Sequence, residues 1–421
     1  MDAEVTSASP VTPSLWKNRD YILLWSGQAV STVGTSVTNL ALPLLILTLT
    51  ESPVWVGVAG ALGSIPYVIF SLIAGALVDR WDRKRVMITC DIGRALALGS
   101  MVVALIPGYL TIWHIVLVAL IINTLFVFFN IAEAACLPQV VAKEQLPDAV
   151  AQNQAAMSSS FLIGPSLGGF LYSLGNALPF VLDMISYIVS AVSLFFIKRP
   201  LQQERPAKTQ SSSIWADIKD GLVWLWQNPL VRHIAFLTSG MNMFLAGQVL
   251  LTIVIAQRLQ APSYLIGLIL AIGGIGSIVG SLIAPKIQKK FSFGQVIISI
   301  PWLFAGFCLL YILVPFSLLL GVIAAGFFLL GPIYNVVQYS YRLALIPDEF
   351  QGRVNSSFRL IAFGAQPLGA LLMGTLLQLA GPSITVLVFT SLLALLALLT
   401  SLNPLVRHAR PLAELAVKSA T

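Results

Sequence analysis

The sequence predicts an all-α integral membrane protein, with twelve transmembrane helices arranged as two pseudo-symmetric six-helix bundles. The first observation is composition: 57% of the 421 residues are hydrophobic and only 10% are charged, whereas soluble proteins carry about 25% charged residues. So few charges cannot cover the surfaces of soluble domains, which excludes a soluble enzyme and a nucleic-acid-binding protein. The second observation is a series of apolar runs near the length of about 20 residues that a membrane helix requires.

Twelve such runs lie between polar breaks along the chain. The first six are expected at 21–49, 54–78, 86–106, 111–135, 151–174 and 178–197. The second six are expected at 230–256, 265–285, 296–314, 316–339, 358–379 and 383–402. The chain then divides into an N-terminal tail (1–20), an N-terminal bundle (21–197), a linker (198–229), a C-terminal bundle (230–403) and a C-terminal tail (404–421).

Lysine and arginine gather in alternate loops, and this asymmetry predicts the orientation. With the N-terminus in the cytoplasm, the inner loops, the linker and the tails hold nearly all basic residues, and the outer loops hold Arg258. We therefore expect a multi-pass protein of the inner (plasma) membrane with both termini in the cytoplasm. The basic excess faces cytoplasm and anionic membrane lipid, so it does not indicate nucleic-acid binding.

The linker has two parts. Its first part, QQERPAKTQSSS, is typical of a flexible connector. Its second part, IWADIKDGLVWLWQ, predicts an amphipathic helix at the inner membrane surface, with an unstructured linker as the alternative. The apolar face would hold Ile214, Trp215, Ile218, Leu222, Leu225 and Trp226. Asp217 and Asp220 fall opposite, and Trp224 breaks the pattern.

The two halves of the chain are related in sequence. Residues 57–88 align without gaps on 267–298 with ten identities in 32 positions, among them Gly57 with Gly267. A second match pairs LPD at 146–148 with IPD at 346–348. Duplicated six-helix bundles occur in many secondary transporters, which bind substrate between the halves.

The strongest local motif is GALVDRWDRKR at 75–85, between the second and third spans. Gly75 would allow two helices to approach closely, and Asp79 would complement a helix N-terminus. The arginines and lysine of the motif suit carboxylates or lipid phosphate. The motif resembles the signature loop of the major facilitator superfamily, G-x-L-x-D-R-x-G-R-K. The matching residues are Gly75, Leu77, Asp79, Arg80, Arg83 and Lys84, with Asp82 in place of the second glycine.

This resemblance implies the major facilitator fold and a gating role for the loop. In the family, the loop locks the cytoplasmic side closed by docking its aspartate, here Asp79, on the eleventh helix. Arg353, Asn355 and Ser356 near the start of that helix are chemically suited to receive it. The corresponding loop of the second half lacks the motif, so only the first half of the chain carries an intact copy.

A second motif, GPSLGG in the fifth span, resembles the end of the superfamily's antiporter motif, G-P-x-x-G-G. Its matching residues are Gly164, Pro165, Gly168 and Gly169, while Ala151 and Ser160 replace the upstream glycines. General small-residue packing with a proline bend is the alternative reading. Three further stretches, at 91–95, 137–154 and 346–359, resemble the macrolide-efflux branch, which is related to enterobactin exporters. The basic residue that many drug–proton antiporters place in the fourth span is absent.

Ionisable residues inside spans are costly in a bilayer and are therefore functional candidates. Asp91 and Arg94 share a helix face and can pair, either as a structural ion pair or as a coupling switch. Glu133 is expected to be a gate partner for the loop arginines. Asp183 has no charged neighbour within one turn and can carry a proton or make a packing hydrogen bond. Spans of the second half hold no acidic residue, so carboxylate coupling belongs to the first bundle.

Polar residues within spans are the candidates for the substrate cavity, although such residues also bridge helices. They are Gln28, Thr35, Asn39, Asn123, Asn242, Gln248, Asn335 and Gln338. Met243 and Phe244 can supply the adaptable apolar wall of a multidrug pocket.

The resemblance implies a secondary active efflux transporter. It would export amphipathic, drug-like or macrolide-like molecules by alternating access, in exchange for protons. Export of an endogenous metabolite, such as a siderophore or a lipid-like compound, is the alternative. We expect a monomer whose partners are a small-molecule substrate, protons and membrane lipids. No catalytic residues, metal site or cofactor are expected, because the histidines are scattered and Cys90, Cys136 and Cys308 lie in or beside apolar stretches.

Overall fold

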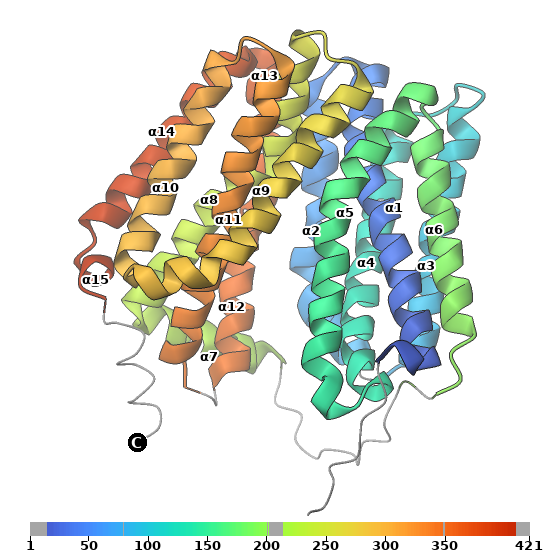
Figure 1. The fold of residues 1–421 in the computed structure, drawn as a ribbon, viewed down its shortest axis with the longest axis horizontal. Helices are drawn as coiled ribbons and strands as arrows, with labels where there is room; N and C mark the ends of the chain where they lie inside the picture. The colour runs from blue at the N-terminus through green and yellow to red at the C-terminus, as the bar shows by residue number, and fades with distance from the viewer. Residues whose placement is uncertain (1–14, 79, 200, 202–213, 348–349, 410–421) are drawn as a thin grey trace, which may run out of the picture.

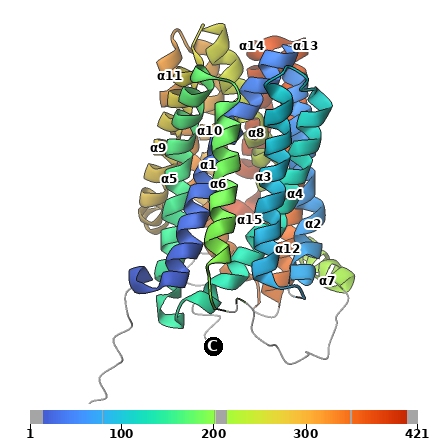
Figure 2. The same cartoon turned by 90° about the vertical axis from the view of Figure 1, so that its right-hand side faces the viewer.

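Two groups of long helices make up the molecule (Figure 1), and in the view turned by 90° the group from the N-terminal half lies in front of the other (Figure 2). The computed structural model describes residues 15–78, 80–199, 201, 214–347 and 350–409. Every regular element in these ranges is helical. The predicted connector at 202–213 lies outside the described residues, as does Asp79 of the loop motif.

The N-terminal bundle contains six helices, on the right in Figure 1. They are α1 (Arg19–Thr50), α2 (Pro53–Val78), α3 (Arg83–Leu105), α4 (Ile112–Val140), α5 (Leu146–Leu174) and α6 (Leu178–Phe195). Short 3-10 turns at Leu15–Lys17 and Lys143–Gln145 precede α1 and α5. Side-chain caps start several helices: Asn18 accepts a hydrogen bond from the amide of Tyr21 on α1, because the first amides of a helix lack intrahelical partners.

The C-terminal bundle repeats this plan on the left in Figure 1. Its helices are α8 (Pro229–Arg258), α9 (Ser263–Lys290), α10 (Phe293–Leu310), α11 (Ser317–Leu345), α12 (Gln351–Gly364), α13 (Gln366–Leu379) and α14 (Gly381–Leu402), with a 3-10 turn at Tyr311–Leu313. The predicted single span at 358–379 is broken between α12 and α13. Pro367 explains the break, because it has no N–H to donate to the carbonyl of Phe363.

Eleven helices of the described residues are long and apolar enough to cross a membrane, with α12 and α13 counted together. The remaining predicted span corresponds to α5, which has 29 residues. This helix is more polar, with a serine run and glycines along its faces, and it packs between α1 and α9. Its polar residues are therefore tolerated because much of its surface faces other helices.

The start of α1, the linker helix α7 (Ile214–Gln227) and the terminal turn α15 (Pro404–Arg407) lie at one end of the molecule (Figure 1), here called the α7 end. The two bundles contact each other through α2 with α13 and through α5 with α9. The backbones of the two bundles approach each other near the starts of α2 and α9. Both helix starts lie away from the α7 end (Figure 1).

Glycines make the contact between α2 and α13. A Cβ on Gly57 would lie 2.6 Å from the carbonyl oxygen of Ala370 and 3.2 Å from Cα of Gly374. A Cβ on Gly374 would lie 2.6 Å from the carbonyl oxygen of Pro53. Backbones this close leave no room for a side chain, so the contact requires glycine.

The contact between α5 and α9 is its counterpart in the other half. A Cβ on Gly267 would overlap the carbonyl oxygen of Pro165 and would lie 3.1 Å from Cα of Gly169. Gly57 and Gly267 are the residues that the internal sequence repeat aligns. The duplication is therefore visible as two matching glycine contacts that hold the bundles together at the end opposite α7.

The linker helix α7 occupies the segment predicted to be an amphipathic helix. It packs on α12, where Gly221 fits against the carbonyl of Arg353, and Asp220 lies 3.4 Å from the Arg353 guanidinium. Leu225 is fully buried, whereas Trp226 is 58% exposed. Trp224, the residue that breaks the predicted apolar face, packs against the core of the C-terminal bundle instead.

Candidate transport site

A central cavity of about 710 Å³ lies between the two bundles. Helices α1, α2, α4 and α5 form one wall, and α8 to α11 with α13 form the other. Its volume is in the range of about 300–1,000 Å³ that is usual for small-molecule sites. A second cavity of about 470 Å³, lined by α2, α4 and α12, also separates the bundles.

Asparagine supplies much of the polar surface of the central cavity. Asn39 of α1, Asn123 of α4 and Asn335 of α11 line it. Within the described part of the chain, the side chains of Asn39 and Asn335 have no hydrogen-bond partner and are exposed. The Asn123 amide donates a 2.8 Å hydrogen bond to the carbonyl of Ala119, which leaves its own oxygen as an acceptor. These amides can therefore bind hydroxyl, carbonyl or amine groups of a ligand.

The rest of the lining is apolar or weakly polar. Four phenylalanines from three helices contribute, together with serines of α1, α2 and α9. They are Phe161, Phe304, Phe327, Phe328, Ser36, Ser64 and Ser277. None of the described lining residues is charged. The predicted wall residue Phe244 lies behind this surface, 5.0 Å from the Phe327 ring and 5.4 Å from the Phe389 ring.

The other five cavity candidates are not among the lining residues. Gln248 is fully buried and donates to the hydroxyl of Tyr311 at 2.7 Å. Asn242 donates to the carbonyl of Ala362 at 2.9 Å, which joins α8 to α12. Gln338 is buried and accepts a 3.4 Å hydrogen bond from Arg342 on the same helix.

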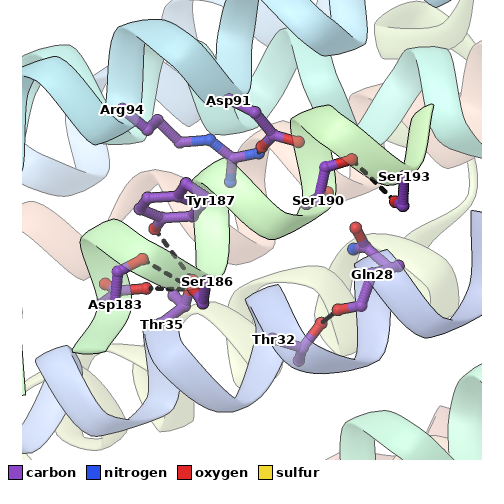
Figure 3. Close-up of polar contacts among 10 residues, drawn as sticks. All are labelled: Gln28, Thr32, Thr35, Asp91, Arg94, Asp183, Ser186, Tyr187, Ser190 and Ser193. Carbon is purple, nitrogen blue, oxygen red and sulfur yellow. Dashed lines mark hydrogen bonds and ion pairs between the residues drawn. The ribbon is translucent and has the colours of Figure 1, made fainter. Parts of the chain in front are cut away.

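The remaining two, Gln28 and Thr35, lie on α1 and face α6 (Figure 3). The Thr35 hydroxyl lies 3.0 Å from the Tyr187 hydroxyl. The buried Gln28 Oε1 has no hydrogen-bond partner within the described chain. By contrast, Ser36 is a lining residue that sequence reasoning missed, although its spacing of three from Asn39 places both on one helical face.

Behind α1, the N-terminal bundle buries a cluster of charged groups. Asp91 and Arg94 of α3 form the expected ion pair and are 0% and 2% exposed. The Arg94 guanidinium lies between two aromatic rings, 4.5 Å from the centre of Phe129 and 4.4 Å from that of Tyr187. Delocalised guanidinium groups tolerate such stacking well.

Asp183 lies nearby on α6, and its carboxylate is also fully buried. Thr38 of α1 donates a 2.6 Å hydrogen bond to Oδ2. The Ser186 hydroxyl lies 3.1 Å from Oδ1 (Figure 3). Gly34 makes this possible, since a Cβ there would lie 2.6 Å from Oδ1. Sequence reasoning found the carboxyl but not Thr38, which is 145 residues away.

Glu133 of α4 completes the cluster, close enough to Asp91 and Arg94 for their charges to interact. Among the described residues it has no ion pair with the loop arginines. Among the described residues, only Asp91 forms an ion pair with Arg94, while Glu133 and Asp183 interact with its charge at longer range. If all were ionised, the cluster would hold two surplus negative charges in a low-dielectric interior, which is unfavourable unless protons bind.

The described part of the loop motif joins helix ends at the α7 end. Lys84 donates to the carbonyls of Phe195 and Ile197 at 3.0 and 2.7 Å, at the end of α6. Arg83 is buried and donates to the carbonyl of Ala135 at 3.0 Å. Asp82, the departure from the motif, caps α3 by accepting from the amide of Arg85.

Two further motif residues, Gly75 and Arg80, contact little in this conformation. The space within 4 Å of a Cβ on Gly75 is empty, so the expected close approach does not occur here. Arg80 is exposed. The ribbons of the bundles diverge toward the α7 end (Figure 1), and the second cavity lies between α2, α4 and α12, beside the contact of Tyr67 with Phe363.

The antiporter-type motif packs α5 against two helices. Gly164 lies against Ser36, and a Cβ on Gly168 would lie 2.9 Å from the carbonyl oxygen of Val37, so both face α1. Pro165 and Gly169 face α9. The motif therefore connects the cavity helix α1 to the contact between the bundles.

The profile of the Major Facilitator Superfamily matches residues 24–358 of this sequence. The chain belongs to the major facilitator superfamily. This confirms the family resemblance of the loop motif and the predicted fold class. It indicates a multi-pass membrane transporter rather than a catalytic enzyme.

Several members of the superfamily resemble this chain. Macrolide efflux protein A of Streptococcus pyogenes is 28% identical over 217 residues, which cover 51% of this chain and 52% of the relative. The multidrug efflux pump Tap of Mycolicibacterium fortuitum is 25% identical over 93% of this chain and 97% of its own. The enterobactin exporter EntS of Escherichia coli O1:K1 is 25% identical over 82% of both. In fold, the nucleoside transporter NupG matches with a TM-score of 0.70, covering 91% of this chain and 98% of NupG at 16% identity.

Proposed function

We propose that this superfamily member is a secondary active efflux transporter that exports amphipathic small molecules of drug or macrolide type by alternating access, in exchange for protons. The observation that carries the proposal is the central cavity, with its phenylalanines, its free asparagine amides and no charge among its described lining residues. Such a surface suits ligands with large apolar faces and scattered polar groups. The efflux and export functions of the three relatives support the direction of transport.

The positive-inside pattern supports an orientation with the α7 end in the cytoplasm of an inner-membrane protein. The two glycine contacts then close the cavity toward the outside. The second cavity lies between the bundles nearer the cytoplasm. This conformation is therefore the one that would receive substrate from the cytoplasm or the inner leaflet.

The acidic cluster behind α1 is our candidate for the proton site. Asp91, Glu133 and Asp183 are buried or half-buried within one bundle, and none of them lines the cavity. Protons and substrate would then bind at separate places and influence each other through the helices between them. In the outward-open state, we propose that the loop at 75–85 closes the cytoplasmic side, with Asp79 docking near the start of α12.

Export of an endogenous metabolite is the second candidate function. The enterobactin exporter among the relatives favours it, and a neutral cavity of this size suits a siderophore or a lipid-like compound as well as a drug. We propose a monomer in either case, because the described cavity lies within a single chain.

Accumulation assays in efflux-deficient cells test the proposal. A panel of macrolides, amphipathic drugs and dyes would be measured with the wild-type protein, with Asn39→Leu and Asn335→Leu, and with no transporter. We expect lower accumulation with the wild type, loss of that effect with a protonophore, and weaker transport in both variants. Unchanged accumulation for every compound would contradict drug export and would favour an endogenous substrate, to be sought in the culture medium. Export that persists with a protonophore would contradict proton exchange.

A further inference from the structure

The threonines of α1 fall into two groups. Thr32, Thr48 and Thr50 donate to the carbonyl four residues earlier on their own helix, and Thr48 also meets the Tyr172 hydroxyl of α5. Thr35 and Thr38 instead bond α6: Thr35 meets the Tyr187 hydroxyl, and Thr38 donates to Asp183. A threonine within a helix can satisfy its hydroxyl on the i−4 carbonyl, so these two bonds across helices are alternatives to a local bond.

The Asp183 site can accommodate both protonation states of its carboxyl. The Ser186 hydroxyl has one proton but lies 2.7 Å from the Asp183 carbonyl oxygen and 3.1 Å from its Oδ1. With an ionised carboxylate, Ser186 donates to Oδ1. With a protonated carboxyl, Oδ1–H donates to Ser186, which then donates to the carbonyl oxygen. In both arrangements each hydroxyl proton has an acceptor.

The neighbours of Asp183 do not replace Thr38. Arg94 of α3 is the cation whose charge reaches Asp183, and Tyr187 of α6 is a titratable neighbour on the same helix. Asp91 of α3 and Glu133 of α4 interact with the same Arg94. The stretches of α1 and α5 at this depth, 22–50 and 149–171, contain no titratable side chain. Among the described contacts, the carboxylate is thus joined to α1 through the Thr38 hydroxyl.

Helix α1 connects this site to the cavity. One face lies on α6, where Gly27 and Gly34 allow the serines of α6 and Asp183 to approach its backbone. Another face lies on α5, against Gly164 and Gly168. A third face lines the cavity with Ser36 and Asn39. A shift of α1 on α6 would therefore move both the cavity wall and the helix that contacts α9.

We propose that Thr38 is the positioning residue through which α1 responds to protonation of Asp183. This inference rests on the proposed proton exchange. When Asp183 is ionised, the charge-assisted bond from Thr38 holds α1 against α6. When a proton binds the carboxyl, that bond weakens, the Thr38 hydroxyl turns to the carbonyl of Gly34, and α1 is released. The glycine and serine surface between the helices allows α1 to move without large side chains interlocking.

The test measures how pH shifts the conformational equilibrium and needs no substrate. Spin labels at the exposed positions 85 and 352 would report the separation of the bundles at the α7 end. Their distance would be measured in lipid nanodiscs by pulsed electron paramagnetic resonance, from mildly acidic to mildly alkaline pH. We expect the wild type to change its distance distribution with pH and Asp183→Asn to lose the change. Thr38→Val keeps the shape of the side chain but removes its hydroxyl. It should reduce the pH-driven change in the ratio of the two conformations about tenfold, which corresponds to the contribution of one charge-assisted hydrogen bond. Thr38→Ser should restore the change.

Thr32→Val is the matched control, because its hydroxyl bonds its own helix, and it should behave as the wild type. One result would overturn the inference and leave proton exchange intact: Thr38→Val keeps the wild-type pH response while Asp183→Asn loses it. A wild type without any pH response would overturn both proposals. A Thr38→Ser protein that stays unresponsive would assign Thr38 to packing and also overturn the inference.

Discussion

Replacing Gly57 with alanine should shift the transporter away from the observed conformation. The added Cβ would lie 2.6 Å from the carbonyl oxygen of Ala370, where ordinary contacts begin at 3.4 Å, and 3.2 Å from Cα of Gly374. Both obstacles are backbone atoms, so α2 and α13 must separate. Overpacking of this kind costs about 1–3 kcal/mol. The cost falls on the state in which this end is closed, so the ratio of the two states should change about 5–150-fold.

The assay is the same distance measurement by spin labels, placed at the end opposite α7, with thermal unfolding measured in parallel. Gly306→Ala is the control, because no atom lies within 4 Å of a Cβ there. An alanine favours a helix by a similar amount in both variants, so that contribution cancels. Gly267→Ala should act like Gly57→Ala, since it changes the matching contact. Equal populations in Gly57→Ala and Gly306→Ala would refute the argument that these contacts hold the end closed.

Three further substitutions test the site. Arg94→Met should destabilise the protein by about 3–5 kcal/mol because it leaves the buried Asp91 carboxylate unpaired; thermal unfolding would show this, and Asp91→Asn in the same chain should recover part of the loss. Asn39→Leu should weaken binding of a polar ligand by about 1–3 kcal/mol without changing thermal stability, and an unchanged dissociation constant would exclude Asn39 from the binding surface. Asp79→Asn should impair export while yield and unfolding temperature stay normal, and full export by this variant would contradict the gate.

The helices were largely predictable because a bilayer imposes one simple requirement on sequence, an apolar run of sufficient length. The helix at Ile214–Gln227 was also predictable, from periodicity. The break before Pro367 and the packing of the half-buried Trp224 against the core were not. The first depends on whether a membrane proline bends or divides a helix, and the second depends on packing against α8 and α12.

The cavity was harder to predict than the helices. Asn39 and Asn335 line it, whereas Asn242 and Gln248 bond other helices. A polar residue inside a span must meet either water or a partner, and sequence does not show which. Thr38 illustrates the same limit, since its role depends on a carboxylate that folding brings to it from 145 residues away.

The neutral lining of the central cavity has an electrical consequence. A charge that crosses the membrane gains or loses about 2.3 kcal/mol per 100 mV, but an uncharged molecule in this cavity would cross without such work. In the proposed exchange, the voltage across the membrane would then act on the protons carried near Arg94 and Asp183. Each turnover would move net positive charge inward, so export of a neutral compound would be electrogenic, driven by membrane voltage as well as by the pH gradient.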